Sequence, residues 1–226
     1  VDDGEARLQS EITWTFLWAA EKYVTQPCVD AQLEALSRNV LKSGQTLEPA
    51  SVIKSGIVSY MARSPSRPQR FPVWDALIGD GTASRFTPER QAFLGRLSDS
   101  MNQARVSEVE NRRLLGRLLV MRDPIALDAV VRANLLTQIN ELRALTTFEA
   151  LNALQRMRLI VDAGSAPSAD IVEAFLNGAA MNTSSSDFSG TVQYCKAQGL
   201  PLADWHDLNK EISANALHAG AGEKSP

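Results

Sequence analysis

Apolar residues recur at three- and four-residue steps along most of the chain, which is the spacing of an α-helix with one face turned to a core. The clearest stretch, residues 87–164, predicts three consecutive helices with few residues between them. Thr87-Pro88-Glu89, Asp123-Pro124 and Thr146-Thr147-Phe148-Glu149 predict their starts, because each offers a capping oxygen with a proline or a glutamate that favours a first helical turn. Gly164 predicts the end of the third helix.

The N-terminal quarter predicts further helices. Residues 5–25 form an apolar repeat that we expect to end before Pro27, since proline lacks the N–H that a helix interior needs. A second helix is predicted over 29–43. Residues 49–63 favour a third helix with a proline in its first turn, although residues 51–60 also alternate as a strand would.

One long irregular segment is predicted over 64–86, where three prolines and a Gly-Asp-Gly turn prevent a continuous helix. Only residues 73–78 could add a short helical turn there. Helices are predicted again after Ser168, over 188–197 and over 202–217.

These elements give an all-α fold class: an irregular multi-helix array or bundle of roughly eight to nine helices with one long proline-rich loop. We expect residues 1–218 to form a single helical domain, which could divide near 64–86, and residues 219–226 to form a flexible tail.

The helix predicted from Pro88, which could reach Arg122, contains an anomaly. Its apolar stripe is interrupted by Glu108 and Arg112, four residues apart on the face that should be buried. The pattern favours a bend near Arg105 that turns this stretch to water. The alternative is a polar site between helices, or an ion pair that fixes the register of a partner.

Charge is distributed unevenly along the 226 residues. The net charge is −3, but residues 63–122 carry 11 basic and 6 acidic side chains. Most of the arginines within residues 63–122 lie near the proline-rich loop or on the helix after it. Because the overall composition is acidic, and the arginines of the helix share no single face and alternate with no aromatic residues, we expect no nucleic-acid binding.

The preferred function is a non-enzymatic protein–protein interaction module, such as an adaptor, a scaffold or a secretion-associated component. Arginine, tryptophan and other aromatic residues are typical of interface hot spots, and self-association into a homo-oligomer stays open. The alternative is that the two aromatic rings of the proline-rich loop, Phe71 and Trp74, fold back into the core. The expected partner-binding residues are Arg67, Arg70, Phe71, Trp74, Arg112, Arg113 and Arg117.

Two other functions stay open. A helical hydrolase could use Glu11 or Glu21 as a carboxylate acid beside Trp14 and Trp18, and a helical carrier could bind an apolar ligand under the first helix. No catalytic motif, cofactor loop or metal-ligand spacing supports an enzyme, so we expect no cofactor and no metal. The densest group of metal-binding residue types, over 204–211, favours a solvated acidic face.

Cys28 and Cys195 could form a disulfide in an oxidising compartment or remain two separate thiols. A first residue other than Met is typical of signal-peptide removal or trimming, so the sequence is compatible with a soluble cytoplasmic, periplasmic or secreted protein. No apolar run approaches the ~20 residues that span a bilayer, so no membrane span is expected.

Overall fold

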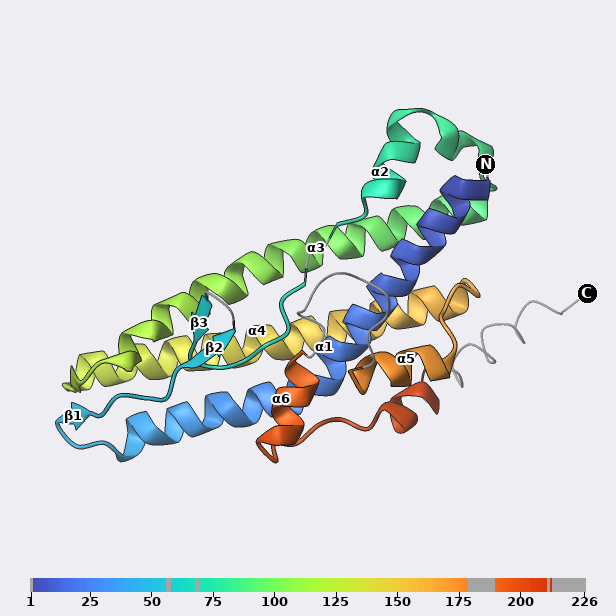
Figure 1. Cartoon of the computed structure of the whole chain (residues 1–226). Coiled ribbons are helices and arrows are strands. Elements are labelled where there is room, and N and C mark those ends of the chain that lie inside the picture. The colour runs from blue at the N-terminus through green and yellow to red at the C-terminus, as the bar shows by residue number, and fades with distance from the viewer. Residues whose placement is uncertain (1, 56–57, 68–69, 179–189, 211, 213–226) are drawn as a thin grey trace, which may run out of the picture.

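The computed structural model describes residues 2–55, 58–67, 70–178, 190–210 and 212, and it is predominantly helical. Three long helices, α1 (Asp2–Lys42), α3 (Pro88–Leu118) and α4 (Ala129–Asp162), run alongside one another (Figure 1). α1 and α3 point the same way, and α4 returns in the opposite direction.

Helix α1 continues through Pro27, so the predicted break between 5–25 and 29–43 is wrong. Proline in a helix interior costs about 3 kcal/mol. Apolar side chains on both sides of it are buried against the rest of the bundle, and this packing outweighs the local cost. The buried residues that continue the stripe beyond the proline are Val29, Leu33, Leu36 and Val40.

The predicted starts of the other long helices are right in one case and wrong in two. Thr87 caps α3 as expected, with its Oγ1 accepting a hydrogen bond from the Arg90 N–H at 3.3 Å. α4 begins after Asp128, whose Oδ1 accepts from the Val131 N–H at 2.7 Å, and not at Asp123-Pro124. The Thr146 hydroxyl donates to the Arg143 carbonyl inside α4, so Thr146 starts no new helix.

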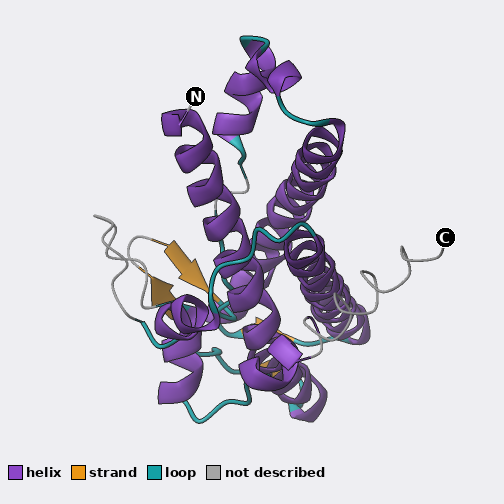
Figure 2. Cartoon of the chain, turned by 90° about the vertical axis from the view of Figure 1, so that its right-hand side faces the viewer, coloured by secondary structure: helices purple, strands orange, loops and turns teal. Residues whose placement is uncertain are grey.

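Short elements occupy the segment between α1 and α3. Strands β2 (Ile53–Ser55) and β3 (Val58–Tyr60) form an antiparallel hairpin beside the long helices, where 49–63 favoured a helix (Figure 2). β1 (Thr46–Leu47) pairs with β4 (Ile125–Ala126). The predicted irregular segment contains α2 (Pro72–Gly79) and the 3₁₀ turn η1 (Thr82–Arg85).

A second 3₁₀ turn, η2 (Leu119–Arg122), extends α3 to the residue at which the sequence predicted its end. Gly164 follows α4 with a φ of 63°, a conformation that favours glycine, as the prediction of a helix end requires. α5 (Ala169–Leu176) begins after Ser168, also as predicted. α6 (Thr191–Ala197) comes next, and the structure joins its Cys195 to Cys28 of α1 by a disulfide.

Within the described residues there are therefore six α-helices and a further short helical segment over 205–210, fewer than the eight to nine predicted. Two predicted pairs are single helices in the structure, and one predicted helix is a hairpin. The predicted tail, residues 219–226, lies outside the described residues.

The core of the bundle is divided in two along its length. One apolar cluster contains the first half of α1, the start of α3 and the end of α4, together with α5 and Trp205. The other contains the second half of α1, the end of α3 and the start of α4. Polar side chains from all three long helices are buried between the two clusters, and they form the candidate site.

Candidate functional site

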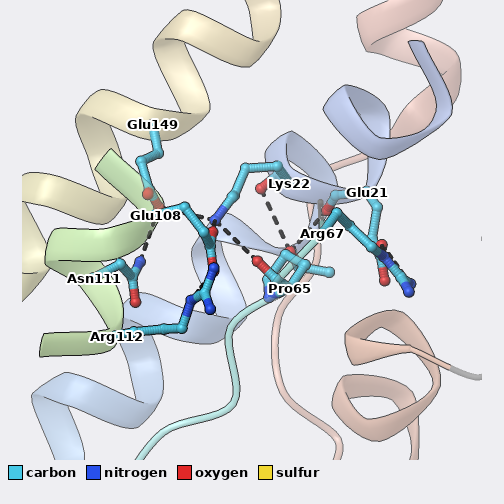
Figure 3. A network of polar contacts seen from close by, with 9 residues as sticks. Glu21, Lys22, Pro65, Arg67, Glu108, Asn111, Arg112 and Glu149 are labelled. Carbon is cyan, nitrogen blue, oxygen red and sulfur yellow. Dashed lines mark hydrogen bonds and ion pairs between the residues drawn. The ribbon is translucent and has the colours of Figure 1, made fainter. Parts of the chain in front are cut away.

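Lys22 of α1 is at the centre of this buried polar layer. Its Nζ donates to the Pro65 carbonyl at 3.0 Å and to Glu149 Oε2 at 2.9 Å, and lies 3.6 Å from Glu108 Oε2 (Figure 3). Both carboxylates are only 5% exposed, and the lysine side chain is 15% exposed. One ammonium group therefore contacts two carboxylates, one from α3 and one from α4.

Further contacts of the two carboxylates come from α3 and from Ser66, whose side chain hydrogen-bonds to Glu108. Asn111 Nδ2 donates to Glu149 Oε2 at 2.9 Å, and Arg112 Nε lies 3.5 Å from Glu108 Oε1. Burial raises the pKa of Glu108 above its usual value, and the nearby Lys22 ammonium opposes that rise. We call Lys22, Glu108, Asn111, Arg112 and Glu149 the central network.

The predicted bend near Arg105 is wrong, because α3 is one continuous helix from Pro88 to Leu118 and Glu108 is buried rather than turned to water. Arg112 is 59% exposed, so its guanidinium covers the network from the solvent side. The alternative interpretation, a polar cluster between helices, describes the geometry of Glu108 and Arg112.

A second ion pair lies beside the central network. Arg67, from the segment before α2, donates through Nε to Glu21 Oε2 at 2.9 Å, and Glu21 is almost completely buried (Figure 3). Glu11, the other predicted carboxylate acid, accepts the Val73 N–H at the start of α2 through both oxygens. Desolvation raises the pKa of Glu11. These contacts give both carboxylates structural roles.

The aromatic residues of the predicted interaction loop are buried. Phe71 is 3% exposed and Trp74 is 5% exposed, and both belong to the first apolar cluster. The Trp74 ring packs near that of Phe86, with centroids 6.4 Å apart. The expectation of an exposed aromatic patch is therefore wrong at these two residues, because the start of α2 packs onto the bundle and takes the rings with it.

The predicted arginines are separated rather than gathered into one patch. Arg70 is exposed on the loop, whereas Arg67 is held by Glu21. Arg112, Arg113 and Arg117 are exposed on α3, and Arg113 Nε donates to Glu110 Oε2 at 2.6 Å. The adjacent Arg112 and Arg113 point in different directions on the helix, but both lie on its exposed side together with Arg117. Exposed valines, which the sequence analysis did not single out, lie on the same side.

Sequence reasoning also missed several buried or half-buried polar residues of the site. Each interrupts an apolar stripe, as Glu108 does, and that interruption is the signal that could have found them. They are Lys22, Asn111, Glu149, Asn152 and Arg156.

Arg156 of α4 and a small cavity complete the layer. Arg156 is 4% exposed, and its guanidinium donates to the Ser100 hydroxyl and carbonyl oxygens of α3. The cavity beside it has a volume of about 20 Å³, room for about one water molecule. A carrier would need a dry cavity of several hundred Å³, and this central cavity is too small for that role.

The acidic group near the C-terminus has a local structural role. Asp204 Oδ1 accepts the His206 N–H at 2.7 Å at the start of the helical segment over 205–210, and Glu211 lies outside the described residues. Within the described part of the chain, no cluster of three or more His, Cys, Asp or Glu side chains could hold a metal ion. No described helix is long and apolar enough to cross a membrane.

No protein-family model, curated protein or solved structure matches this chain. The functional interpretation therefore depends on the residues and their geometry.

Proposed function

We propose that the protein binds another protein through the outer face of α3, and that the partner presents an acidic amphipathic helix. The observation that carries this proposal is the exposure of three valines on and just after α3. Val106 is 68% exposed, Val109 is 61% exposed and Val120 is 52% exposed. Isolated exposed apolar residues are common, but Val106 and Val109 lie three residues apart and therefore share one face of α3, and Val120 follows in η2.

The charge around the valines selects the class of partner. The exposed charged residues beside them on α3 are mostly cationic. The nearby acids that are not buried lie close to arginines: Glu110 is paired with Arg113, Asp123 is paired with Arg122, and Glu141 of α4 lies near Arg113. An apolar stripe with arginines at its edges is typical of an interface core and rim. The arginines of this face are Arg105, Arg112, Arg113 and Arg117.

Charge complementarity also argues against a second copy on this face. Two α3 helices packed through their outer faces would bring like-charged arginine rows together, which weakens association. An acidic helix would place its apolar stripe on the valines and its carboxylates on the arginines. Such a complex would form faster at low ionic strength and weaken as salt is added.

Site-specific photo-crosslinking tests the proposal. A photoreactive amino acid at position 109 should form an adduct in cells that produce the protein, whereas the same group at Val130, an exposed valine of α4, should not. Peptide mass spectrometry should locate the adduct in a Glu- and Asp-rich helix of another protein. Adducts with a second copy of this chain only, or equal labelling from positions 109 and 130, would contradict the proposal.

A matched pair of variants then measures the contribution of the valines to binding of that partner. Val106→Asp with Val109→Asp should weaken it at least tenfold, because carboxylates replace the apolar contacts and repel the acidic partner. Val130→Asp adds one carboxylate elsewhere and should leave affinity unchanged. Circular dichroism checks that every variant remains helical.

A further inference from the structure

Arg156 is a buried cation whose direct contacts are all neutral. Its Nε lies 3.1 Å from Ser100 Oγ, and its Nη2 lies 3.3 Å from the Ser100 carbonyl oxygen. No carboxylate within the described residues forms an ion pair with it. Burial lowers its pKa to about 10, and the more distant charge of Glu149 only partly opposes that effect. A buried charge without a contacting counter-ion is strongly destabilising.

Two further hydrogen-bond donors lack partners in the same place. Trp18 Nε1 and Asn152 Nδ2 are both buried, and neither has a hydrogen-bond acceptor among the described residues. Trp18, Asn152 and Arg156 all line the cavity of about 20 Å³. Because a buried N–H without an acceptor costs free energy, all three side chains favour an acceptor within the cavity.

The carboxylates near the cavity do not supply that acceptor. Glu149 is held by Lys22 and Asn111, and Glu108 is held between Lys22 and Arg112. Two acids are thus matched by two bases before Arg156 is considered. The charge left over in this layer is positive.

We propose that the cavity binds one monatomic anion of about the size of chloride, with Trp18, Asn152 and Arg156 as its ligands. A water molecule would accept from the tryptophan and asparagine N–H groups, but it would leave the guanidinium uncompensated. A polyatomic anion such as phosphate is too large for a volume of about 20 Å³. This site is independent of the partner-binding face on α3.

Bromide is the probe, because it resembles chloride and scatters anomalously. Crystals of the full chain grown in sodium bromide should show an anomalous peak in the cavity. In solution, bromide or chloride should raise the melting temperature above that in gluconate at equal ionic strength. The rise should be about 2–4 °C when the halide is at about five times its dissociation constant, and it should grow further with the logarithm of the halide concentration.

Asn152→Asp separates this proposal from a general salt effect. The new carboxylate would supply the missing counter-ion, so the variant should fold and its halide-dependent rise should disappear. Val130→Asp, which adds a carboxylate at an exposed position, should keep the full rise. An empty or water-filled cavity in the bromide crystals, or an equal halide response in Asn152→Asp and the parent protein, would overturn the proposal.

Discussion

Replacing Lys22 by methionine should destabilise the protein more than any exposed charge substitution. Met keeps the length and most of the volume of the side chain, but it removes the ammonium that lies 2.9 Å from Glu149 Oε2 and 3.6 Å from Glu108 Oε2. Removing one partner of a buried ion pair costs about 3–5 kcal/mol, because the other charge stays buried. At about 2–4 °C per kcal/mol for a chain of this size, the melting temperature should fall by about 6–20 °C.

The loss of stability in Lys22→Met should also depend on pH. Without the ammonium, burial would raise the pKa of Glu108 further above that of an unfolded glutamate, about 4.3. A carboxyl whose pKa is higher in the folded state stabilises that state most below its unfolded pKa, and this contribution is lost as the pH rises through the folded pKa. The deficit of Lys22→Met relative to the parent protein should therefore narrow as the pH falls from 7 towards 4.3.

Urea unfolding and thermal melts, followed by tryptophan fluorescence and circular dichroism, measure the effect. Arg113→Met is the matched control, since it removes a cation from an exposed pair on α3 and should leave the melting temperature almost unchanged. A triple variant, Lys22→Met with Glu108→Leu and Glu149→Leu, removes all three charges and should recover most of the loss. A loss in Lys22→Met no larger than that in Arg113→Met would refute this account of the central network.

Two further predictions concern covalent and backbone constraints. Replacing Cys28 and Cys195 together by serine should lower the free energy of unfolding by about 2–5 kcal/mol, measured in urea, because the disulfide closes a loop with a sequence separation of 167; a stability equal to that of the parent would contradict this. Gly164→Ala should cost about 1–2 kcal/mol, because Gly164 has a φ of +63°. Gly116→Ala, in an open position within α3, should instead raise the free energy of unfolding by about 0.5–1 kcal/mol, because alanine favours a helix more than glycine does. Thermal melts in which both variants shift the melting temperature in the same direction would contradict the argument.

The sequence predicted those parts of the fold that depend on neighbouring residues. The Thr87 cap, the end of α4 at Gly164 and the start of α5 after Ser168 each use groups only a few positions apart. The break predicted at Pro27 was wrong because packing along both halves of α1 outweighs the local cost of a proline within a helix. The helix start predicted at Thr146 was wrong because its hydroxyl, which could cap a new helix, instead donates to the Arg143 carbonyl within the continuous α4.

The candidate site was only partly predictable for a different reason. The interruption of the α3 stripe at Glu108 was visible, but its partner Lys22 is 86 positions away in the chain, and the sequence does not say which turns of the three helices meet. Glu149 resembled the end of a capping box, although its carboxylate binds Lys22. The burial of Phe71 and Trp74 likewise depends on where α2 packs, which local patterns do not specify.

The position of the central network suits it to fix how the three long helices align, a role separate from its net contribution to the stability of the protein. It lies between two apolar clusters built from the same three helices, and apolar side chains alone tolerate sliding of one helix past another. A slip of α3 by one turn would move Glu108 about 5.4 Å along the bundle and leave both it and Lys22 buried without their partners. We infer that the network fixes the register of α1, α3 and α4. The triple apolar variant tests this as well: it should keep its helical content while its amide NMR spectrum loses dispersion, and a spectrum as well dispersed as that of the parent would show that packing alone sets the register.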